Sequence, residues 1–208
     1  MDSYMNFDFS DFSANQRYHL MTQTIIPRPI AWALTDSGNG SFNLAPFSYF
    51  TAVSSAPPIL MLSVGKKPNG DDKDTLANII KNEKVVIHIA SEQHASLVTQ
   101  TAQTLAHGES ELTDAGIETT EFANFSLPRI AQCDIAYGCE LYEIKPLGDV
   151  PQSLIFVEVK QVYINDKVVD IDEKQRIKVH ADRIQPLARL GGAEYATINN
   201  PFEISRPK

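Results

Sequence analysis

The stretch NLAPFSYFTAVSSAPPILMLSVG, residues 43–65, decides how this chain folds. Its apolar, β-branched and aromatic runs meet at a Pro-Pro turn, which predicts two strands, over residues 41–54 and 59–65. Pro46 lies inside the first of these strands. Because proline has no N–H to donate to a sheet ladder, it belongs on an edge, at a bulge or where the backbone directs its groups elsewhere. We therefore expect this strand to depart from a fully paired ladder near Pro46.

Further strands are expected on both sides of this stretch. Residues 30–35, IAWALT, form a hairpin with residues 41–54 around the turn DSGNG, whose residues tolerate positive φ. Alternating apolar residues predict another strand over 84–90, and two longer runs lie at 131–145 and 153–164. Because the strands come in clusters rather than in strict βαβ alternation, a closed or nearly closed antiparallel barrel is favoured over a doubly wound sheet.

Two helices are expected beside these strands. The run DTLANIIKN has apolar residues at helical spacing, with Asp74 as the expected N-cap. A second helix is predicted over residues 91–105, with Ser91 as its N-cap. In the otherwise irregular region that follows, one helical turn ends at Gly116. Residues 1–20 are expected to wrap the surface of the domain or of a neighbouring molecule.

Composition narrows the class of protein. The chain has 208 residues and is 43% hydrophobic, enough to bury a core within one domain. A formal net charge of −8 argues against a nucleic-acid-binding surface. The N-terminus lacks the pattern of a secretory signal, and no apolar run approaches the roughly 20 residues needed to span a membrane. Cys133 and Cys139 would lie about 20 Å apart along one strand, too far for a disulfide. These features predict a soluble, reduced, cytoplasmic protein.

The first candidate binding surface lies around Pro46. Strand alternation places Asn43 and Ala45 on one face and Leu44, Pro46 and Ser48 on the other. A small residue, a proline and a serine form a concave patch, and Asn43 and Ser48 offer side-chain donors, so this edge could hold a flat polar heterocycle or a phosphate. The alternative, equally weighted on physical grounds, is an edge strand with an incidental bulge.

The second candidate is the start of the helix in KDTLANI. Helix N-termini present unpaired N–H groups and a partial positive charge, which suit a phosphate. We expect Asp74 to hold the turn, and Lys73 and Thr75 to face the ligand. Taken alone, the motif is more simply an ordinary capped surface helix. Two anion-friendly sites flanking the strand 59–65 strengthen the functional interpretation.

These motifs together resemble one known family. PRPIAWALT (27–35), GSFNLAPFSYFTAVSSAPPILMLSVG (40–65) and KDTLANI (73–79) are similar to the flavin reductase-like family of FMN-binding split barrels, and GESELTDAGI (108–117) and ARLGGAEY (188–195) add weaker likeness. The resemblance implies a mainly β fold, a Greek-key antiparallel barrel of six to seven strands with two flanking helices. It also implies homodimers that bind FMN near the subunit interface.

The resemblance covers most of residues 25–197 and so implies one domain over residues 1–208, with residues 1–24 as an N-terminal extension. Its implied cofactor contacts are Asn43, Ala45, Pro46 and Ser48 along the flavin, Ser63 at the ring or ribityl chain, and Lys73, Asp74 and Thr75 at the phosphate. Arg28 and Trp32 lie in the matching first motif, although Trp32 could equally be a core residue. No metal ligand or catalytic side chain is implied, because flavin N5 accepts hydride directly.

The implied activity is that of an FMN-dependent NAD(P)H oxidoreductase, which passes hydride from the nicotinamide to FMN and on to a second acceptor. That acceptor could be free flavin, a small molecule or a partner oxygenase. The alternative is a protein that carries or senses FMN, or transfers electrons like a flavodoxin; haem binding ranks last. Among the histidines, His88 is expected in the core, His94 and His107 at the surface, and His180 is a weak candidate for the nicotinamide side.

Overall fold

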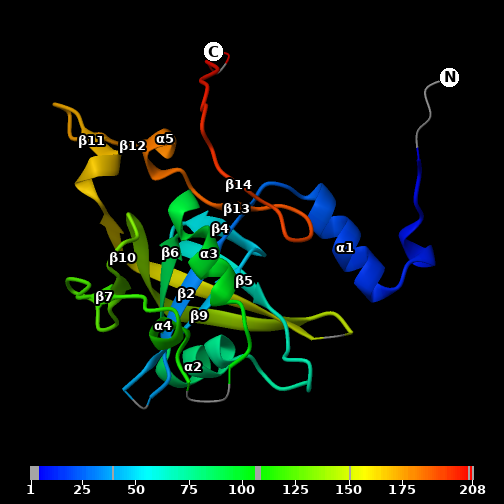
Figure 1. Ribbon diagram of the computed structural model, residues 1–208. Coiled ribbons are helices and arrows are strands. Elements are labelled where there is room, and N and C mark those ends of the chain that lie inside the picture. The colour runs from blue at the N-terminus through cyan, green and yellow to red at the C-terminus, as the bar shows by residue number, and fades with distance from the viewer. Residues whose placement is uncertain (1–4, 39, 106–108, 150, 206, 208) are drawn as a thin grey trace.

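A seven-stranded antiparallel sheet carries the fold (Figure 1). The structure is a computed structural model that describes residues 5–38, 40–105, 109–149, 151–205 and 207. In spatial order the strands are β3 (Phe42–Phe47), β2 (Ala31–Asp36), β6 (Lys84–Ile89), β9 (Ile135–Leu147), β10 (Gln152–Ile164), β5 (Pro58–Val64) and β4 (Phe50–Ser55). The expectation of an antiparallel barrel of six to seven strands is confirmed.

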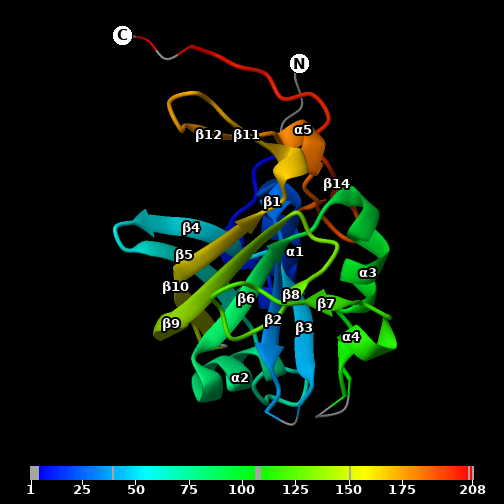
Figure 2. The ribbon, with the colours of Figure 1, turned by 90° about the vertical axis from the view of Figure 1, so that its left-hand side faces the viewer.

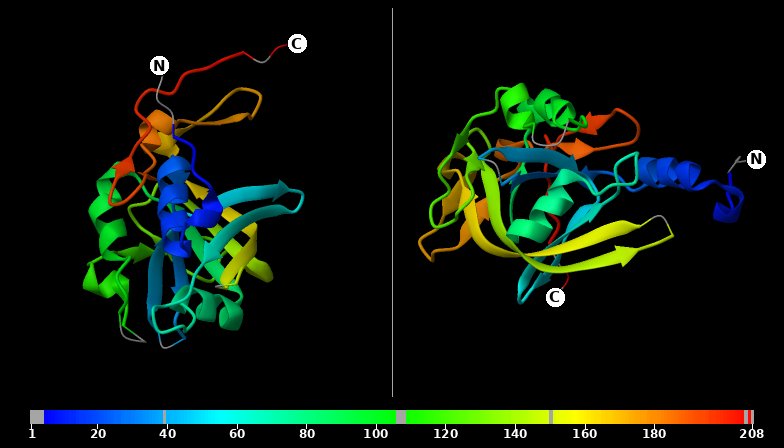
Figure 3. Two further views of the ribbon diagram at one scale, coloured as in Figure 1. Left: turned by 90° about the vertical axis from the view of Figure 1, so that its right-hand side faces the viewer. Right: turned by 90° about the horizontal axis from the view of Figure 1, so that it is seen from below.

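The two edge strands of this sheet follow each other in the chain. Strand β3 ends at Phe47 and β4 begins at Phe50, so Ser48 and Tyr49 alone connect opposite edges. The sheet must therefore curl until its edges approach, and Figure 3 shows it curving around α2 (Asp74–Asn82). The backbone N–H of Ser63 donates to the Tyr49 carbonyl at 2.9 Å and holds the connection against β5. The prediction of one strand over 41–54 was thus wrong, because the chain leaves one edge and joins the other at Ser48.

Two apolar clusters pack on the two faces of the central strands. Trp32 and Leu34 point to one face of β2, whereas Ala31 and Ala33 point into the barrel. Both faces of β2 and β6 are buried, which explains why these strands read as continuous apolar runs instead of alternating ones. Helix α2 turns Leu76 and Ile79 into the barrel cluster, whereas Ile80 lies exposed on its outer face.

The helices differ from expectation in number and in length. A helix absent from the predictions, α1 (Ala14–Thr24), lies beside the barrel (Figure 1) and begins with a capping box between Ser13 and Gln16. The predicted helix over 91–105 is shorter: a 3-10 turn, η2 (Glu92–His94), leads into α3 (Ala95–Gln100). The helical turn before Gly116 is α4 (Glu111–Asp114), and the positive φ of Gly116 follows it as expected.

Smaller elements complete the described part of the chain. Figure 2 shows two hairpins projecting from the body, one formed by β11 (Val169–Ile171) and β12 (Ile177–Val179) and the other by β4 and β5. None of the described helices has the length and apolar character needed to cross a membrane. Both cysteines are buried and free. The remaining elements are η1 (Phe9–Asp11), β1 (Arg28–Pro29), β7 (Thr119–Thr120), β8 (Arg129–Ile130), η3 (Asp166–Val168), β11 (Val169–Ile171), β12 (Ile177–Val179), α5 (Ala181–Ile184), β13 (Ala188–Arg189) and β14 (Tyr195–Ala196).

Candidate functional site

Pro46 lies at the open edge of β3. The register between β2 and β3 runs without a shift from Ala31↔Phe47 to Asp36↔Phe42, so this strand contains no bulge at the proline. The N–H of Leu44 points away from β2 and donates to Glu111 Oε2 at 3.0 Å. Because backbone groups alternate in direction along a strand, position 46 also faces outward, where a proline sacrifices no ladder bond. Along this edge, the outward N–H of Leu44 is therefore bonded to the Glu111 carboxylate, and Pro46 has no N–H to offer.

The start of α2 lies against this edge, one residue away from where it was expected. The N-cap is Lys73, which has extended backbone angles, and Asp74 is the first helical residue. The prediction of Asp74 as N-cap was wrong; its carboxylate instead forms an ion pair of 2.9 Å with Lys67 Nζ. Asp74 does hold the turn, because this pair ties the preceding loop to the helix.

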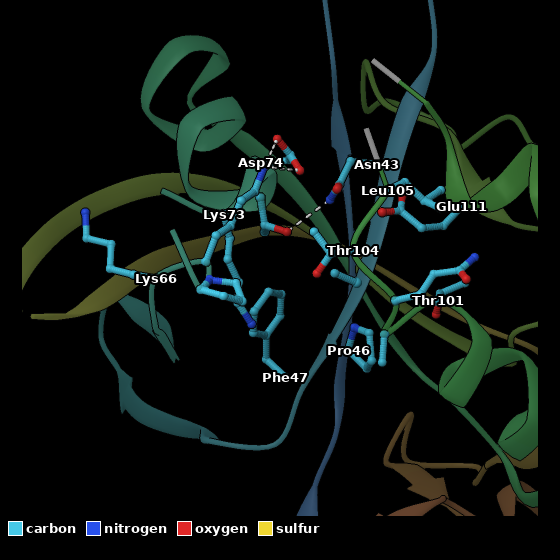
Figure 4. A pocket seen from close by; sticks show the side chains of 16 residues that line it. Asn43, Pro46, Phe47, Lys66, Lys73, Asp74, Thr101, Thr104, Leu105 and Glu111 are labelled. Carbon is cyan, nitrogen blue, oxygen red and sulfur yellow. Dashed lines mark hydrogen bonds and ion pairs between the residues drawn. The ribbon is translucent and has the colours of Figure 1, made fainter. Parts of the chain in front are cut away.

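A hydrogen bond joins the edge strand directly to α2. Asn43 Nδ2 donates to Thr75 Oγ1 at 3.0 Å, and both side chains are buried. Figure 4 shows Asn43 directed toward the start of the helix, with Lys73 and Asp74 beside it. The hydrogen bond between Asn43 and Thr75 therefore holds β3 against the start of α2. Both side chains also line the cavity between these two elements.

Two neighbouring cavities along this edge together form what we call the edge groove. One cavity of 340 Å³ lies between β3, the start of α2 and residues 101–105, and the other, of 500 Å³, lies between β3, β5 and α1. Pro46, Phe47 and Lys73 line both cavities, so the two cavities adjoin at these side chains. The residues of the edge groove used below are Asn43, Ala45, Pro46, Phe47, Ser48, Tyr49, Ser63, Lys66, Lys67, Lys73, Asp74, Thr75 and Glu111.

A third, more apolar cavity of 610 Å³ adjoins the groove. It shares Ser48, Tyr49 and Ser63 with the groove and is otherwise lined mainly by apolar side chains of α1 and of strands β4, β5 and β10. Arg28 lies on its wall. A polar end, a middle section along β3 and an apolar end therefore follow one another through three adjoining cavities.

Charged groups concentrate at the polar end. Lys66 pairs with Asp72, and Lys67 pairs with Asp74. The Lys73 side chain is exposed, but its ammonium group lies between the groove walls, 5.5 Å from the centre of the Phe47 ring, and this partial desolvation lowers the pKa of Lys73. An anion placed there would replace lost hydration around the ammonium group, so this end of the groove favours a negatively charged ligand.

Glu111 is an acid within the same cavity. Burial raises the pKa of the Glu111 carboxyl, and the hydrogen bond from the Leu44 N–H opposes that shift. Its buried carboxylate lies on the far side of the groove from Lys73 (Figure 4). The cavity is therefore not uniformly positive, and the side of Lys73 and α2 suits an anion best.

Most of the predicted cofactor contacts lie on this surface. Asn43, Ala45, Pro46, Ser48, Ser63, Lys73, Asp74 and Thr75 line the edge groove, and Arg28 lines the adjoining cavity. Trp32 lines neither: it is fully buried, and its Nε1 donates to Thr101 Oγ1 at 2.9 Å. Trp32 thus occupies the core position considered as its alternative, and it supports the segment 101–105 that walls the groove.

Sequence reasoning missed Lys66, Lys67 and Glu111. The Lys-Lys pair follows the glycine that ends the strand at residue 65, a signal that was present in the chain. Glu111 lies in the recognised GESELTDAGI motif, but its contact to Leu44 spans 67 residues and has no local signature. Tyr18 also lines the groove, from the helix α1 that was not predicted.

The histidines that the structure describes lie outside the groove. His88 is buried as expected, donating from Nδ1 to the Trp32 carbonyl at 3.0 Å and accepting the Ile130 N–H at Nε2 at 2.9 Å. Burial lowers the pKa of His88 to about 4. His94 was expected at the surface but is buried, and it accepts the Ser91 N–H at 3.1 Å. His180 pairs with Asp170 in the β11–β12 region, and His107 lies outside the described residues.

An open antiparallel barrel with a groove along its free edge defines a small-ligand-binding domain of the split-barrel class. Residues 21–177 match the model of the flavin reductase like domain. The chain therefore belongs to the flavin reductase-like family, and the fold and family expected from the motifs are confirmed.

Relatives resemble the chain over nearly its whole length. Nitrilotriacetate monooxygenase component B from Bacillus cereus is 31% identical, with a TM-score of 0.87 over 98% of this chain and 100% of that chain. The 2-nitrobenzoate 2-nitroreductase NbaA of Pseudomonas fluorescens is 30% identical, with a TM-score of 0.86 over 98% of this chain and 96% of that chain. The uncharacterized protein YwrF of Bacillus subtilis (strain 168) is 33% identical over 205 residues, 97% of this chain and 98% of the relative.

Proposed function

We propose that the edge groove binds FMN. The observation that carries this proposal is that two adjoining cavities place the charged end at Lys73 and the start of α2 beside the wall formed by Pro46, Phe47 and Ser48. The two cavities have the size of ligand sites in proteins. The groups present fit the cofactor: Lys73 and the N–H groups at the start of α2 would hold the phosphate, and the Pro46–Ser48 segment would lie along the flavin.

We propose further that the protein is an oxidoreductase that takes hydride from NAD(P)H and passes the electrons to a second acceptor. When bound, FMN supplies the redox chemistry, and the chain supplies position and electrostatics. Ser48 and Ser63 would orient the flavin by hydrogen bonds, and Tyr18 and Tyr49 would shield it from water. Similarity to an oxygenase component and a nitroreductase supports this class, with a small molecule, free flavin or partner oxygenase as acceptor.

The test is the visible spectrum of the purified protein after FMN titration, followed by anaerobic mixing with NADH and, separately, NADPH. An FMN-binding reductase develops a protein-bound flavin spectrum that bleaches rapidly with at least one nicotinamide. Bleaching only with dithionite or a protein donor would favour the alternative, a carrier or electron-transfer protein. A protein that takes up no FMN would refute both.

We also propose a homodimer. The edge strand β4 is exposed along residues 51–55, and open edges invite pairing unless they are covered. Beside it, the apolar side chains of Met21 and Ile25 are exposed at the rim of the 610 Å³ cavity. A second subunit covering this region would shield the edge of β4 and the side chains of Met21 and Ile25 from water. Sedimentation velocity at micromolar concentration tests the assembly, and a monomer there would contradict it.

A further inference from the structure

Arg28 is a buried cation surrounded by neutral groups. It is 5% exposed, and its guanidinium donates to the carbonyls of Thr22, Ile25 (3.0 Å) and Leu190 (2.8 Å). Its Nε donates to Ser48 Oγ at 3.4 Å. None of the ion pairs found among the described residues involves Arg28. Its positive charge is therefore solvated by dipoles and is not cancelled by a carboxylate.

Burying an unpaired cation in this way costs free energy of folding. Buried charges in proteins are usually paired, and an unpaired one destabilises the fold. An arginine cannot relieve this cost by losing its proton. The four acceptors come from the end of α1, from the tail after β13 and from the connection after β3, so several elements converge to hold the cation in one place.

The charge of Arg28 acts on the groove. Ser48 and Tyr49 separate Arg28 from the flavin path, and both line the edge groove and the third cavity. Because Ser48 Oγ accepts from Arg28, its hydroxyl proton is free to be donated elsewhere. Burial and the neighbouring Tyr18 raise the pKa of Tyr49, whereas Arg28 opposes this shift. Arg28 therefore favours negative charge on groups at this position.

We propose that Arg28 is a positioning residue for the flavin chemistry: from behind Ser48 and Tyr49, its charge stabilises the negative charge that the flavin ring acquires on reduction. This inference rests on the proposed function. Hydride from NAD(P)H brings two electrons and one proton and leaves NAD(P)⁺, so the reduced ring keeps one negative charge unless a second proton follows from water. A fixed cation nearby favours leaving that second proton in solution.

The experiment measures the midpoint potential of the FMN-loaded protein, together with its affinity for oxidised FMN. In Arg28→Gln we expect oxidised FMN to bind within about threefold of wild type. Reduced FMN should bind about tenfold more weakly, which lowers the two-electron potential by about 30 mV. Arg28→Lys, which keeps the charge, should stay near the wild-type potential.

Arg189→Gln is the matched control. Arg189 pairs with Arg28 across β1 and β13, but its side chain stacks on Tyr195, 4.5 Å from the ring centre, outside the groove. We expect its potential to remain at the wild-type value. An unchanged potential in Arg28→Gln, or an equal shift in Arg189→Gln, would overturn the proposal.

Because Arg28 also ties elements together, Arg28→Gln could fail to fold, and the wild-type protein supplies an independent test. The slope of potential against pH changes from about 59 to about 30 mV per pH unit where the reduced flavin loses its second proton. We expect this change of slope at a lower pH for FMN bound to the protein than for free FMN measured in the same electrochemical cell. A change of slope at the same or higher pH would refute the role of Arg28, whereas failure to bind FMN would refute the proposed function itself.

Discussion

Replacing Lys73 by alanine tests the charged end of the groove most directly. A hydrogen bond to a charged group contributes about 1.5–3 kcal/mol. Lys73 is exposed and therefore screened by solvent, so the low end of about 1.5 kcal/mol applies. That free energy corresponds to about tenfold weaker FMN binding. Riboflavin has the same ring without the phosphate, and its affinity should change by less than about threefold.

The assay is fluorescence titration of the apoprotein with FMN and with riboflavin, at low and at high salt. Lys81→Ala is the control, because it removes the same charge from the last turn of the same helix, away from the groove. The tenfold loss should shrink as salt screens the phosphate interaction. Equal losses for FMN and riboflavin, or the same effect in Lys81→Ala, would show that Lys73 does not contact the phosphate.

Three other predictions concern Ser48, Glu111 and His88. Ser48→Val should weaken flavin binding about two- to tenfold by removing a hydrogen bond, while the apoprotein melts within a few degrees of wild type; a collapse of the apoprotein would make Ser48 structural. Glu111→Ala should lower the free energy of unfolding by about 1–3 kcal/mol, because the Leu44 N–H loses its acceptor; Glu111→Gln should recover most of this, and urea titration that finds both variants equally unstable would contradict the reasoning. His88 is neutral in the fold, with its pKa lowered to about 4 from 6.5, so the unfolded chain takes up the proton first as pH falls. Stability should be full above pH 6.5 and decrease by about 3 kcal/mol on reaching pH 4; urea titrations across this range should show the loss in wild type, and a loss of the same size in His88→Gln would exclude His88 as its source.

Most strands could be predicted because their signals are local, although the break at Ser48 and Tyr49 that divides residues 41–54 was missed. The DSGNG turn contains Gly38 and Gly40, which both adopt positive φ in the structure and allow the hairpin to close. The order of the motifs at residues 27–35, 40–65 and 73–79 identified the family, and most of the contacts predicted from it line the groove. Local periodicity and turn chemistry were sufficient for the hairpin, whereas the family was identified by the order of motifs that lie in different elements.

The elements that were missed depend on weak or distant signals. Helix α1 buries only Thr22, so it has almost no apolar face to reveal it, and the capping box between Ser13 and Gln16 was its one clear sign. The bond from Asn43 to Thr75 joins residues 32 positions apart. No local sequence pattern shows that such side chains meet, so this hydrogen bond became visible only in the structure.

The placement of the groove follows from how the sheet closes. A curled sheet whose edge strands are joined by Ser48 and Tyr49 has to bring its two free edges together beside that connection. Along β3, Glu111 satisfies the outward Leu44 N–H, and Pro46 presents none, so this edge offers no donor for a further strand there. The opening that remains is bounded by side chains instead of by a competing ladder. A flat ligand can therefore lie against β3 without competing for backbone hydrogen bonds, and the same proline that protects the edge keeps it accessible.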